Sequence, residues 1–488
     1  APWVVPTPEL RNAWVACGMN SLGILNGAGT GMVLAHWIVD GLPPIDVTGI
    51  NVNRFTKCEA TPAFRRDRTP ELLGKLFGQH FHNESPKTAR NVKRSVLYDR
   101  LQAAGAYFGE GHGWEQPDWF APSPQEAKIE KLSWFRQNWF DWHAEEHRAA
   151  REDVIVMDMT SMSCFLVQGR DACALLSRLS CNEVNVDPGR VVYTAWVNEA
   201  GGFEADLTVT RLEQDKFMVV VGENSHGQTE MRMRRHIGPD EFVTITDVTA
   251  GRAQINVHGP KSRELLSRVS DTDLSNEAFP FMTAREIDVG YASVLAMRVT
   301  FVGELGWELH VPSTQAVQTY DLLMEAGADL GVRNAGMQTL NSLRLEKAYR
   351  DFGIDVDNTD NPIEAGLGFA VKLDKPGGFV GRDALAAIKA RGVPQTRMLQ
   401  FLLNDPEPLL YGNELIYLGT EQVGYIQVGG YGHTLMGAVG IGFVELDCPV
   451  SADLVAKGPW SVEVAGQRIA ANASLKPMLD PTLENVRC

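Results

Sequence analysis

The chain has 488 residues, of which 44% are hydrophobic and 22% are charged. These fractions are typical of globular proteins and exclude a disordered chain, a collagen and a coiled coil. At roughly 150 residues per domain, the length predicts about three domains. The 45 basic and 61 acidic residues give a net charge of −16. An acidic surface repels phosphate backbones and anionic lipids, so we expect neither nucleic acid nor a membrane as a partner.

Seven cysteines occur at irregular spacing and without a CxxC pair. An odd number in this arrangement indicates structural thiols in a reducing compartment rather than a disulfide framework. The sequence contains no HExxH, no Cys/His metal spacing, no GxSxG and no Walker loop. We therefore expect no bound metal. The histidines at 80, 82, 112 and 433 are scattered and are interpreted as surface or packing residues.

A glycine-rich run near the start of the chain, Gly27 to Gly31 with Thr30 inside it, precedes an apolar run from Met32 to Asp40. The apolar run predicts a helix that ends at Gly41. Glycines in front of a helix can bring backbone N–H groups and the positive end of the dipole to a cofactor. The dinucleotide fingerprint needs a further glycine where Met32 stands, so an independent Rossmann motif is not predicted. Close helix packing is the alternative explanation for the glycines.

The remaining chain divides by pattern into four stretches. Residues 56–100 are polar and basic and predict helices with a connector. Residues 105–143 are rich in tryptophan, glycine and proline and are interpreted as an irregular segment that packs across a domain surface. From about 150 to 390, strand-like and helix-like runs alternate. From about 395, short strands separated by glycine turns predict a small terminal β-domain.

The most informative run, residues 191–211, predicts a β-hairpin: a strand, an Asn/Gly turn and a second strand. A symmetric turn centred at 199–200 would place Tyr193 directly across from Asp206, with Cβ atoms about 5 Å apart. A glycine bulge at 201–202 would shift that register by one residue. A phenol beside a carboxylate is a candidate polar site, and a solvated outer face is the alternative.

A second glycine-turned hairpin is predicted at residues 299–311, where Glu304 and Glu308 stand among Phe, Trp and Leu. Carboxylates in an apolar setting are rarely buried without partners. One of them could therefore receive the hydrogen-bond donors of a ligand. The alternative is a salt bridge to Arg298 or Arg344.

Seven runs together carry a resemblance to a known family: Ala16–Ile24, Ala35–Gly41, Phe108–Glu115, Gly201–Thr208, Gly303–Glu308, Ser342–Lys347 and Pro362–Leu367. Nearly the whole chain resembles the C-terminal part of the sarcosine and dimethylglycine dehydrogenases. That part is similar to the aminomethyltransferase (T-protein) of the glycine cleavage system. The resemblance implies an α+β fold, with a folate-binding body of antiparallel sheets and helices and a small C-terminal β-barrel. A remnant of a flavin domain would precede them.

The resemblance also implies domain boundaries. Residues 1–55 would be the C-terminal tail of an FAD-binding oxidoreductase domain, and residues 56–111 a connector from its central region. Residues 112–392 would form the aminomethyltransferase-like folate-binding domain, and residues 393–488 the barrel. We expect the chain to be a piece of a longer protein whose flavin chemistry lies upstream of Ala1.

In that family a flavin domain oxidises an N-methyl amine to an iminium, and the folate-binding half captures the carbon as 5,10-methylenetetrahydrofolate. By position, Asp206 matches the catalytic aspartate and Tyr193 a folate-contacting tyrosine. Glu308 matches the glutamate that holds the pterin, whose adjacent N–H and amino groups a carboxylate accepts as a pair. Gly27, Gly29 and Thr30 match the last flavin-contacting element. The implied cofactors are tetrahydrofolate and FAD, the latter in a site that is incomplete without upstream residues.

The implied partners are an N-methyl amine, a folate, and an upstream flavin domain or partner chain. Phe301, Thr210 and Leu340 stand where T-proteins carry tyrosine, tyrosine and arginine, so some folate contacts differ. Two alternatives remain: a non-catalytic regulatory subunit, like that of pyruvate dehydrogenase phosphatase, and a stand-alone aminomethyltransferase. Retention of the three matched site residues favours catalysis. We expect the mitochondrial matrix if the source is eukaryotic and the cytoplasm otherwise.

Overall fold

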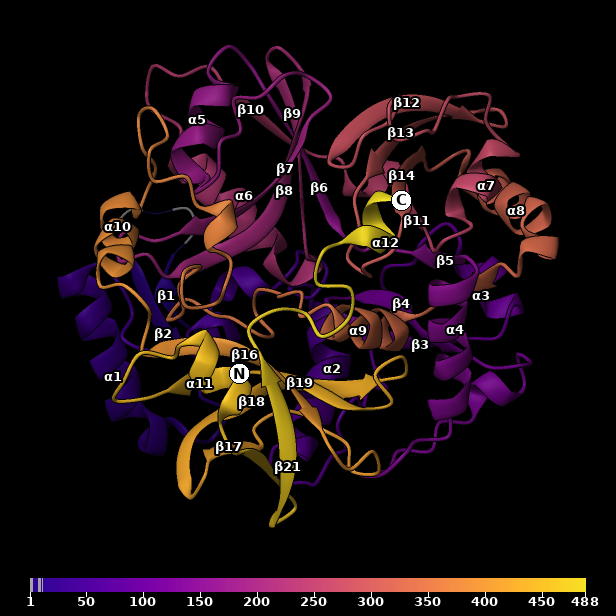
Figure 1. Ribbon diagram of the computed structural model, residues 1–488. Helices are drawn as coiled ribbons and strands as arrows, with labels where there is room; N and C mark the ends of the chain where they lie inside the picture. The colour runs from indigo at the N-terminus through magenta and orange to yellow at the C-terminus, as the bar shows by residue number, and fades with distance from the viewer. Residues whose placement is uncertain (1–2, 8–9, 11) are drawn as a thin grey trace.

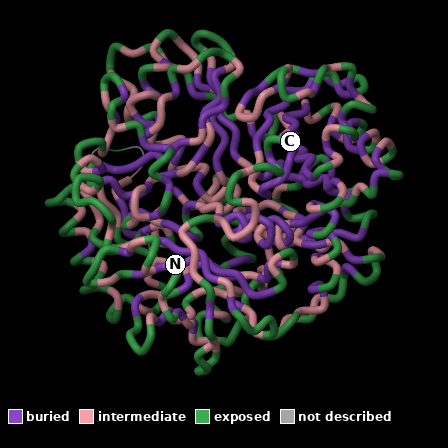
Figure 2. Tube along the Cα trace, in the orientation of Figure 1, coloured by how far each residue is buried: buried purple, intermediate pink, exposed green. Residues whose placement is uncertain are grey.

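The computed structural model describes residues 3–7, 10 and 12–488. A five-stranded sheet, a six-stranded sheet and a closed barrel form three lobes that meet at the centre of the molecule (Figure 1). The buried residues follow the strands of each lobe, and the exposed residues follow the loops between them (Figure 2). The predicted α+β class, with antiparallel sheets and a terminal barrel, is confirmed.

The five-stranded sheet has the order β10-β6-β9-β8-β7, and all its neighbouring strands are antiparallel. Apolar and polar residues alternate along β8, so Ala205, Leu207 and Val209 are buried on the face that packs against the helices. The polar residues between them, including Asp206, therefore point to the opposite face. The elements of this lobe are β6 (Ser163–Gln168), β7 (Val191–Val197), β8 (Phe203–Glu213), β9 (Lys216–Val221), β10 (Thr244–Asp247), α5 (Ala172–Leu179) and α6 (His226–Arg235).

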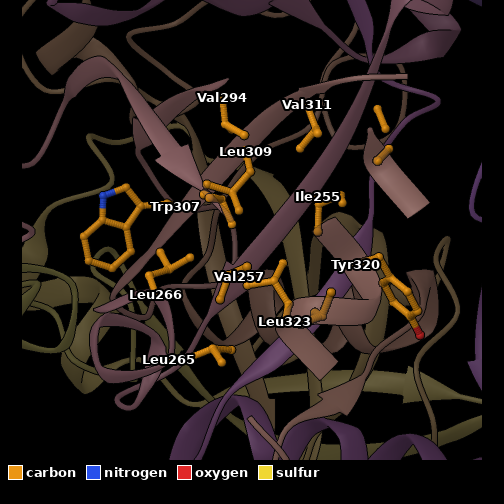
Figure 3. Packing of buried hydrophobic residues seen from close by; sticks show 14 of the residues in the cluster. Ile255, Val257, Leu265, Leu266, Val294, Trp307, Leu309, Val311, Tyr320 and Leu323 are labelled. Atoms are coloured by element: carbon orange, nitrogen blue, oxygen red, sulfur yellow. The ribbon is translucent and has the colours of Figure 1, made fainter. Parts of the chain in front are cut away.

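The six-stranded sheet has the order β12-β13-β14-β11-β5-β15, and only the short pair β15–β5 is parallel. One face packs on α7 and α8, where Ile255 and Val257 of β11 contact the apolar residues of β14 and Leu323 (Figure 3). Its elements are β5 (Ile155–Asp158), β11 (Arg252–His258), β12 (Thr283–Val289), β13 (Ala292–Arg298), β14 (Gly306–Pro312), β15 (Arg333–Asn334), α7 (Ser262–Ser267) and α8 (Ala316–Ala326). The second strand of the hairpin predicted at 299–311 is confirmed as β14, but the predicted first strand was wrong: residues 299–305 form the connecting loop, and β14 pairs with β13, which ends at Arg298.

The C-terminal lobe is the predicted β-domain, a barrel closed in the order β16-β19-β18-β17-β20-β21. Its interior is apolar, with Phe401, Ile416, Ile426 and Val462 buried. The elements are β16 (Thr396–Leu403), β17 (Leu415–Leu418), β18 (Glu421–Gly432), β19 (Gly437–Glu445), β20 (Trp460–Val464), β21 (Gln467–Ser474) and α11 (Ala452–Lys457). Closure pairs both edges and so leaves no open strand.

The N-terminal segment consists of β1 (Trp3–Pro6), β2 (Trp14–Cys17), α1 (Gly23–Asp40) and α2 (Pro62–Lys75). Helix α1 ends before Gly41, whose φ of 82° is left-handed, as predicted. Its start was predicted wrongly, because α1 begins at Gly23 and not at Met32. Asn20 and Ser21 adopt positive φ angles of 44° and 70°. These two residues turn the chain into the helix well before the glycine-rich run.

Residues 105–143 are irregular only in part: residues 121–139 contain a single short 3-10 turn, whereas the residues on either side form regular elements, which corrects the interpretation there. They form the antiparallel hairpin β3 (Ala106–Gly111) and β4 (Trp114–Phe120), followed by the start of α4 (Phe140–Glu152); α3 (Tyr98–Ala103) precedes them. The Trp119 ring stacks on Tyr107 with centroids 4.7 Å apart and on Trp139 with centroids 5.6 Å apart. The strand pairing shifts by one residue next to Phe108, which pairs with Pro117. This shift interrupts the alternation of apolar and polar side chains that would have indicated strands in the sequence.

Helix α9 (Met337–Glu346) lies at the centre of the molecule, where it contacts α4, β4 and the barrel strand β18, while α10 (Arg382–Ala390) lies at the periphery (Figure 1). After β21 the chain leaves the barrel and ends in α12 (Glu484–Arg487) against the six-stranded lobe (Figure 1). Along this tail Asp480 Oδ2 accepts from Lys347 Nζ at 2.9 Å, and the Asn485 amide donates to Glu304 at 3.2 Å. A fully buried ammonium such as Lys347 requires such a partner.

Within the described residues, no helix is long and apolar enough to cross a membrane. The seven cysteines are all free, with Cys164 and Cys181 buried and Cys173 half-buried. These thiols fill the core as small apolar side chains, as the sequence predicts.

Candidate functional site

Tyr193 and Asp206 lie on adjacent strands of the five-stranded sheet, but they are not directly opposed. Tyr193 pairs with Thr208, and Asp206 pairs with Ala195. The loop between the strands has an odd number of residues, with Gly201 at a φ of 88°, and Glu204 forms a bulge beyond it. Each of these two features shifts the pairing register of the strands by one residue. Because side chains alternate between the faces of a sheet, a total shift of two residues again places Tyr193 and Asp206 on the same face. The Tyr193 hydroxyl consequently donates diagonally to Asp206 Oδ2 at 3.2 Å.

The carboxylate of Asp206 is held in a fixed orientation. The backbone N–H of Phe352, in the loop after α9, donates to Oδ1 at 3.2 Å. Burial raises the pKa of Asp206 to about 6, although the Phe352 N–H and the Tyr193 hydroxyl oppose the shift. Burial and the neighbouring Asp206 raise the pKa of Tyr193 well above its usual value. At neutral pH the pair is therefore a protonated phenol and an ionised carboxylate that can accept a ligand's proton.

Further charged residues of the same loop surround this pair. Arg344 of α9 is buried and donates to both oxygens of Asp355, at 2.5 and 3.1 Å. Burial, Asp206 and Asp355 raise the pKa of Asp351 well above its usual value. The sequence predicted no role for Asp351 or Asp355, and for Arg344 only a salt bridge to one of the hairpin glutamates, although Arg344 belongs to one of the runs that carry the resemblance. Arg344 and Arg350 both lie near these carboxyl groups, so the charges around Asp206 are largely balanced.

Glu308 lies on β14 of the six-stranded sheet, directly across from Asn256. Its side chain is 15% exposed, and its carboxylate accepts no hydrogen bond from any residue that the structure describes. Burial raises its pKa to about 7. Burial chiefly raises the pKa of the Cys164 thiol on β6, and the charge of Glu308 adds to that shift, so Glu308 lies near β6. A buried carboxylate without donors is unfavourable, so this position suits a ligand that brings its own donors.

The alternative partners considered for the two glutamates were wrong. Arg298 donates to the carbonyl oxygen of Phe279, and Arg344 is paired with Asp355. Glu304 is paired with Arg151, whose Nη1 lies 2.8 Å from its carboxylate. The two glutamates of the hairpin therefore differ, because Glu304 is satisfied by the protein and Glu308 is not.

Gly27, Gly29 and Thr30 lie far along the chain from this site and within α1, not in a loop. Their backbone N–H groups are used by the helix, and no described atom lies within 4 Å of a Cβ built on Gly27 or Gly29. The Thr30 hydroxyl contacts Met19 Sδ at 3.9 Å. These residues form neither a phosphate cradle nor a close packing contact, so they do not fit a flavin site by themselves.

Two cavities lie away from these carboxylates. One lies between α4, α9 and the barrel and includes His82, His143 and Tyr431 in its lining. The other lies between the N-terminal segment and α6, near Trp37 and Arg232. Neither is lined by Asp206, Tyr193 or Glu308. No group of His, Cys, Asp and Glu among the described residues has the arrangement of a metal site.

Three family models match consecutive parts of the sequence. The FAD dependent oxidoreductase central domain matches residues 40–95. The GCVT N-terminal domain matches residues 97–375, and the glycine cleavage T-protein C-terminal barrel domain matches residues 397–480. The two T-protein models thus cover the sheets and the barrel described above.

Several curated proteins are similar over nearly the whole chain. The 4-methylaminobutanoate oxidase (formaldehyde-forming) of Paenarthrobacter nicotinovorans is 39% identical over 99% of this chain and 57% of that protein. Mitochondrial sarcosine dehydrogenase of Homo sapiens is 33% identical over 100% of this chain and 57% of that protein. The mitochondrial pyruvate dehydrogenase phosphatase regulatory subunit of Mus musculus is 32% identical over 97% of this chain and 56% of that protein. The chain therefore spans little more than half the length of these relatives.

The fold also matches a solved structure, the glycine cleavage system aminomethyltransferase T from Bartonella henselae, with a TM-score of 0.67 and 22% identity. The match covers 80% of this chain and 99% of that one, and at this identity it shows the fold alone. The family models and the fold agree on the two-sheet body and the barrel. The chain belongs to the glycine cleavage T-protein (GCVT) family, among members that also carry an FAD dependent oxidoreductase central domain.

Proposed function

We propose that this chain binds tetrahydrofolate between its two sheets and uses it to capture the one-carbon unit of an oxidised N-methyl amine. The product would be 5,10-methylenetetrahydrofolate, and the amine sarcosine, dimethylglycine or a related N-methyl amino acid. The observation that carries the proposal is Glu308, a largely buried carboxylate that accepts no hydrogen bond from the described residues and lies near β6, a strand of the sheet that bears Asp206 and Tyr193.

Glu308 would bind the pterin. The amino group and the adjacent ring N–H of a pterin point in one direction and match the two oxygens of a carboxylate. These donors would favour the ionised form of Glu308, whose pKa burial raises to about 7. Binding would therefore supply the hydrogen bonds that the protein itself does not.

Asp206 would act on the folate nitrogen that attacks the iminium carbon. In the first step the nitrogen lone pair forms a C–N bond, the C=N electron pair moves to the amine nitrogen, and the folate N–H proton passes to a base. An ionised Asp206 held by Tyr193 and the Phe352 N–H is oriented to accept that proton. In the second step the amine nitrogen takes up a proton and leaves with its C–N electron pair, while the second folate nitrogen bonds to the same carbon and gives up its own proton. The ionised Asp206 would also stabilise the cationic iminium before attack.

The exposed apolar face of α1 supports an upstream flavin domain or a partner chain. Ile24, Leu25 and Val39 are exposed at 103%, 77% and 81%, and only Val33 of this helix is buried. Contiguous apolar surface of this kind marks an interaction site. We infer that FAD is bound mainly by that partner, with Gly27, Gly29 and Thr30 near the interface. We also propose the mitochondrial matrix as the compartment in a eukaryotic source, and the cytoplasm otherwise.

Two experiments test this function. Titration of the chain with tetrahydrofolate should show saturable binding that weakens at least tenfold in Glu308→Gln, and an absence of binding would exclude the folate site. In the full-length flavoenzyme, Asp206→Ala should leave amine oxidation intact but release more formaldehyde. Glu213→Gln, at an exposed position on the same strand, is the matched control. An unchanged yield of methylenetetrahydrofolate would remove Asp206 from the mechanism.

A regulatory role is the second candidate, because one relative of similar identity is a regulatory subunit. The same experiments separate the two functions. A regulatory subunit would show no transfer of the carbon unit to tetrahydrofolate, and its interactions would not depend on Asp206. A stand-alone aminomethyltransferase is disfavoured by the match of residues 40–95 to a flavoenzyme domain.

A further inference from the structure

The face of the six-stranded sheet that bears Glu308 carries a row of polar side chains with unused hydrogen-bonding atoms. His310 lies two residues beyond Glu308 on β14, directly across from Gln254 on β11. Both ring nitrogens of His310 and the Oε1 atom of Gln254 are buried and have no hydrogen-bond partner. The unsatisfied atoms therefore continue beyond Glu308 along the strand. Buried polar groups without partners in a native fold indicate a missing water or ligand.

His310 stands beside the carboxylate in a position that one ligand edge can span. The His310 ring is fully buried, and its Nε2 lies 4.0 Å from Glu308 Oε2. This separation is too long for a hydrogen bond, so neither group satisfies the other. Burial and the nearby Arg252 lower the pKa of His310 to about 3. The ring is therefore neutral at physiological pH and carries one N–H donor.

We propose that His310 is a specificity-determining residue that donates its Nε2–H to the carbonyl oxygen of the bound pterin. This inference rests on the proposed folate function. The edge of a pterin presents an amino group, a ring N–H and a carbonyl oxygen in that order, which is two donors and then one acceptor. Glu308 and His310 present two acceptors and then one donor. Glu308 and His310 together thus provide a partner for all three groups of the pterin edge, whereas Glu308 alone provides partners only for the two donors.

His258 provides an internal comparison on the same face. It is also fully buried with both ring nitrogens unpartnered, and it lies across from Gly306 at the other end of β11. A Cβ built on Gly306 would lie 2.1 Å from His258 Nδ1, so the ring occupies the space above that glycine. No carboxylate is paired with it. His258 therefore matches His310 in residue type and burial. It differs in that no carboxylate stands beside it to bind the rest of the pterin edge.

The test compares tetrahydrofolate with its 4-amino-4-deoxy analogue, in which an amino group replaces the carbonyl oxygen and the adjacent ring nitrogen no longer carries a hydrogen. Glu308→Gln is titrated alongside, because the second change affects the contact with Glu308. Both compounds are titrated into the chain and into the variants His310→Leu, His310→Gln and His258→Leu, and the thermal midpoint of each variant is measured. His310→Leu should bind tetrahydrofolate roughly tenfold more weakly and discriminate less between the two compounds. His310→Gln can place an amide N–H at the position of Nε2 and should regain most of the affinity. His258→Leu should bind both compounds as the wild type does.

The outcomes separate the inference from the function on which it rests. If the wild type does not bind tetrahydrofolate, the proposed function fails. If the wild type binds and Glu308→Gln binds weakly, but His310→Leu equals the wild type, only the role of His310 is overturned. If His310→Leu does not fold, His310→Gln decides. Its amide can present either oxygen or nitrogen at the position of Nε2, so it should discriminate less between the two compounds than the wild type does, and a preference equal to that of the wild type would overturn the proposal.

Discussion

Replacing Glu308 by glutamine should stabilise the fold while it removes a binding group. The pKa of Glu308 is raised from 4.5 to about 7 because its charge is buried without donors. Each tenfold change in an acid constant corresponds to about 1.4 kcal/mol, so the ionised form costs the fold about 3 kcal/mol above pH 7. The penalty is present above the folded pKa and disappears as the pH falls below the unfolded pKa. It should therefore be about 1 kcal/mol at pH 5.

The assay is equilibrium urea unfolding followed by tryptophan fluorescence, for wild type and Glu308→Gln at pH 8 and pH 5. The variant should be more stable at pH 8, with the gain largely lost at pH 5. Glu304→Gln on the same hairpin is the matched control. Because Glu304 is paired with Arg151 at 2.8 Å, this change should destabilise the protein. A Glu308→Gln variant that is less stable at pH 8, or equally shifted at both pH values, would refute the reasoning.

Three further predictions concern the site and its supports. In Asp206→Asn the rate of one-carbon transfer should fall about 100-fold. In the wild type this rate should increase as the pH rises through 6 and Asp206 ionises, and in the variant that increase should be absent. An unchanged pH–rate profile would contradict this prediction. Asp480→Ala should lower the free energy of unfolding by about 3 kcal/mol, because it leaves the buried Lys347 ammonium without its carboxylate. In the same urea assay Asp453→Ala, at an exposed ion pair, should change nothing measurable. Arg344→Lys should lose about 2 kcal/mol by breaking a two-point contact, and an unaltered unfolding midpoint would show that a single ammonium suffices.

Local pattern was sufficient where one element could be recognised by itself. Alternation along 203–209 predicted a strand with Asp206 on the polar face, and the structure confirms both. The helix end at Gly41 and the strands of the barrel followed from glycine turns in the same way. The register of the first hairpin did not follow, because loop length and a bulge at Glu204 each shift it by one residue. Neither feature has a strong signal in the side chains.

The start of α1 and the hairpin at 106–120 show a second limit. Glycine disfavours a helix by only about 1 kcal/mol per residue, so a run with three glycines can still be helical. Likewise, proline next to a bulge can remain within a strand pair, as Pro117 does opposite Phe108. In both cases the preference of the local sequence for one secondary structure was weak. The turn into the helix determined the start of α1, and packing determined the hairpin at 106–120.

The sequence by itself determined the acidic balance, the elements with a clear local pattern such as β8, and the three candidate residues Tyr193, Asp206 and Glu308. Only the tertiary structure decided which carboxylates are satisfied. Glu304 and Glu308 are four residues apart in one hairpin, yet one meets Arg151 and the other meets no donor among the described residues. The orientation of Asp206 depends on Phe352, which is 146 residues away in the chain. Such contacts are set by how separate elements pack, and local periodicity does not encode that information.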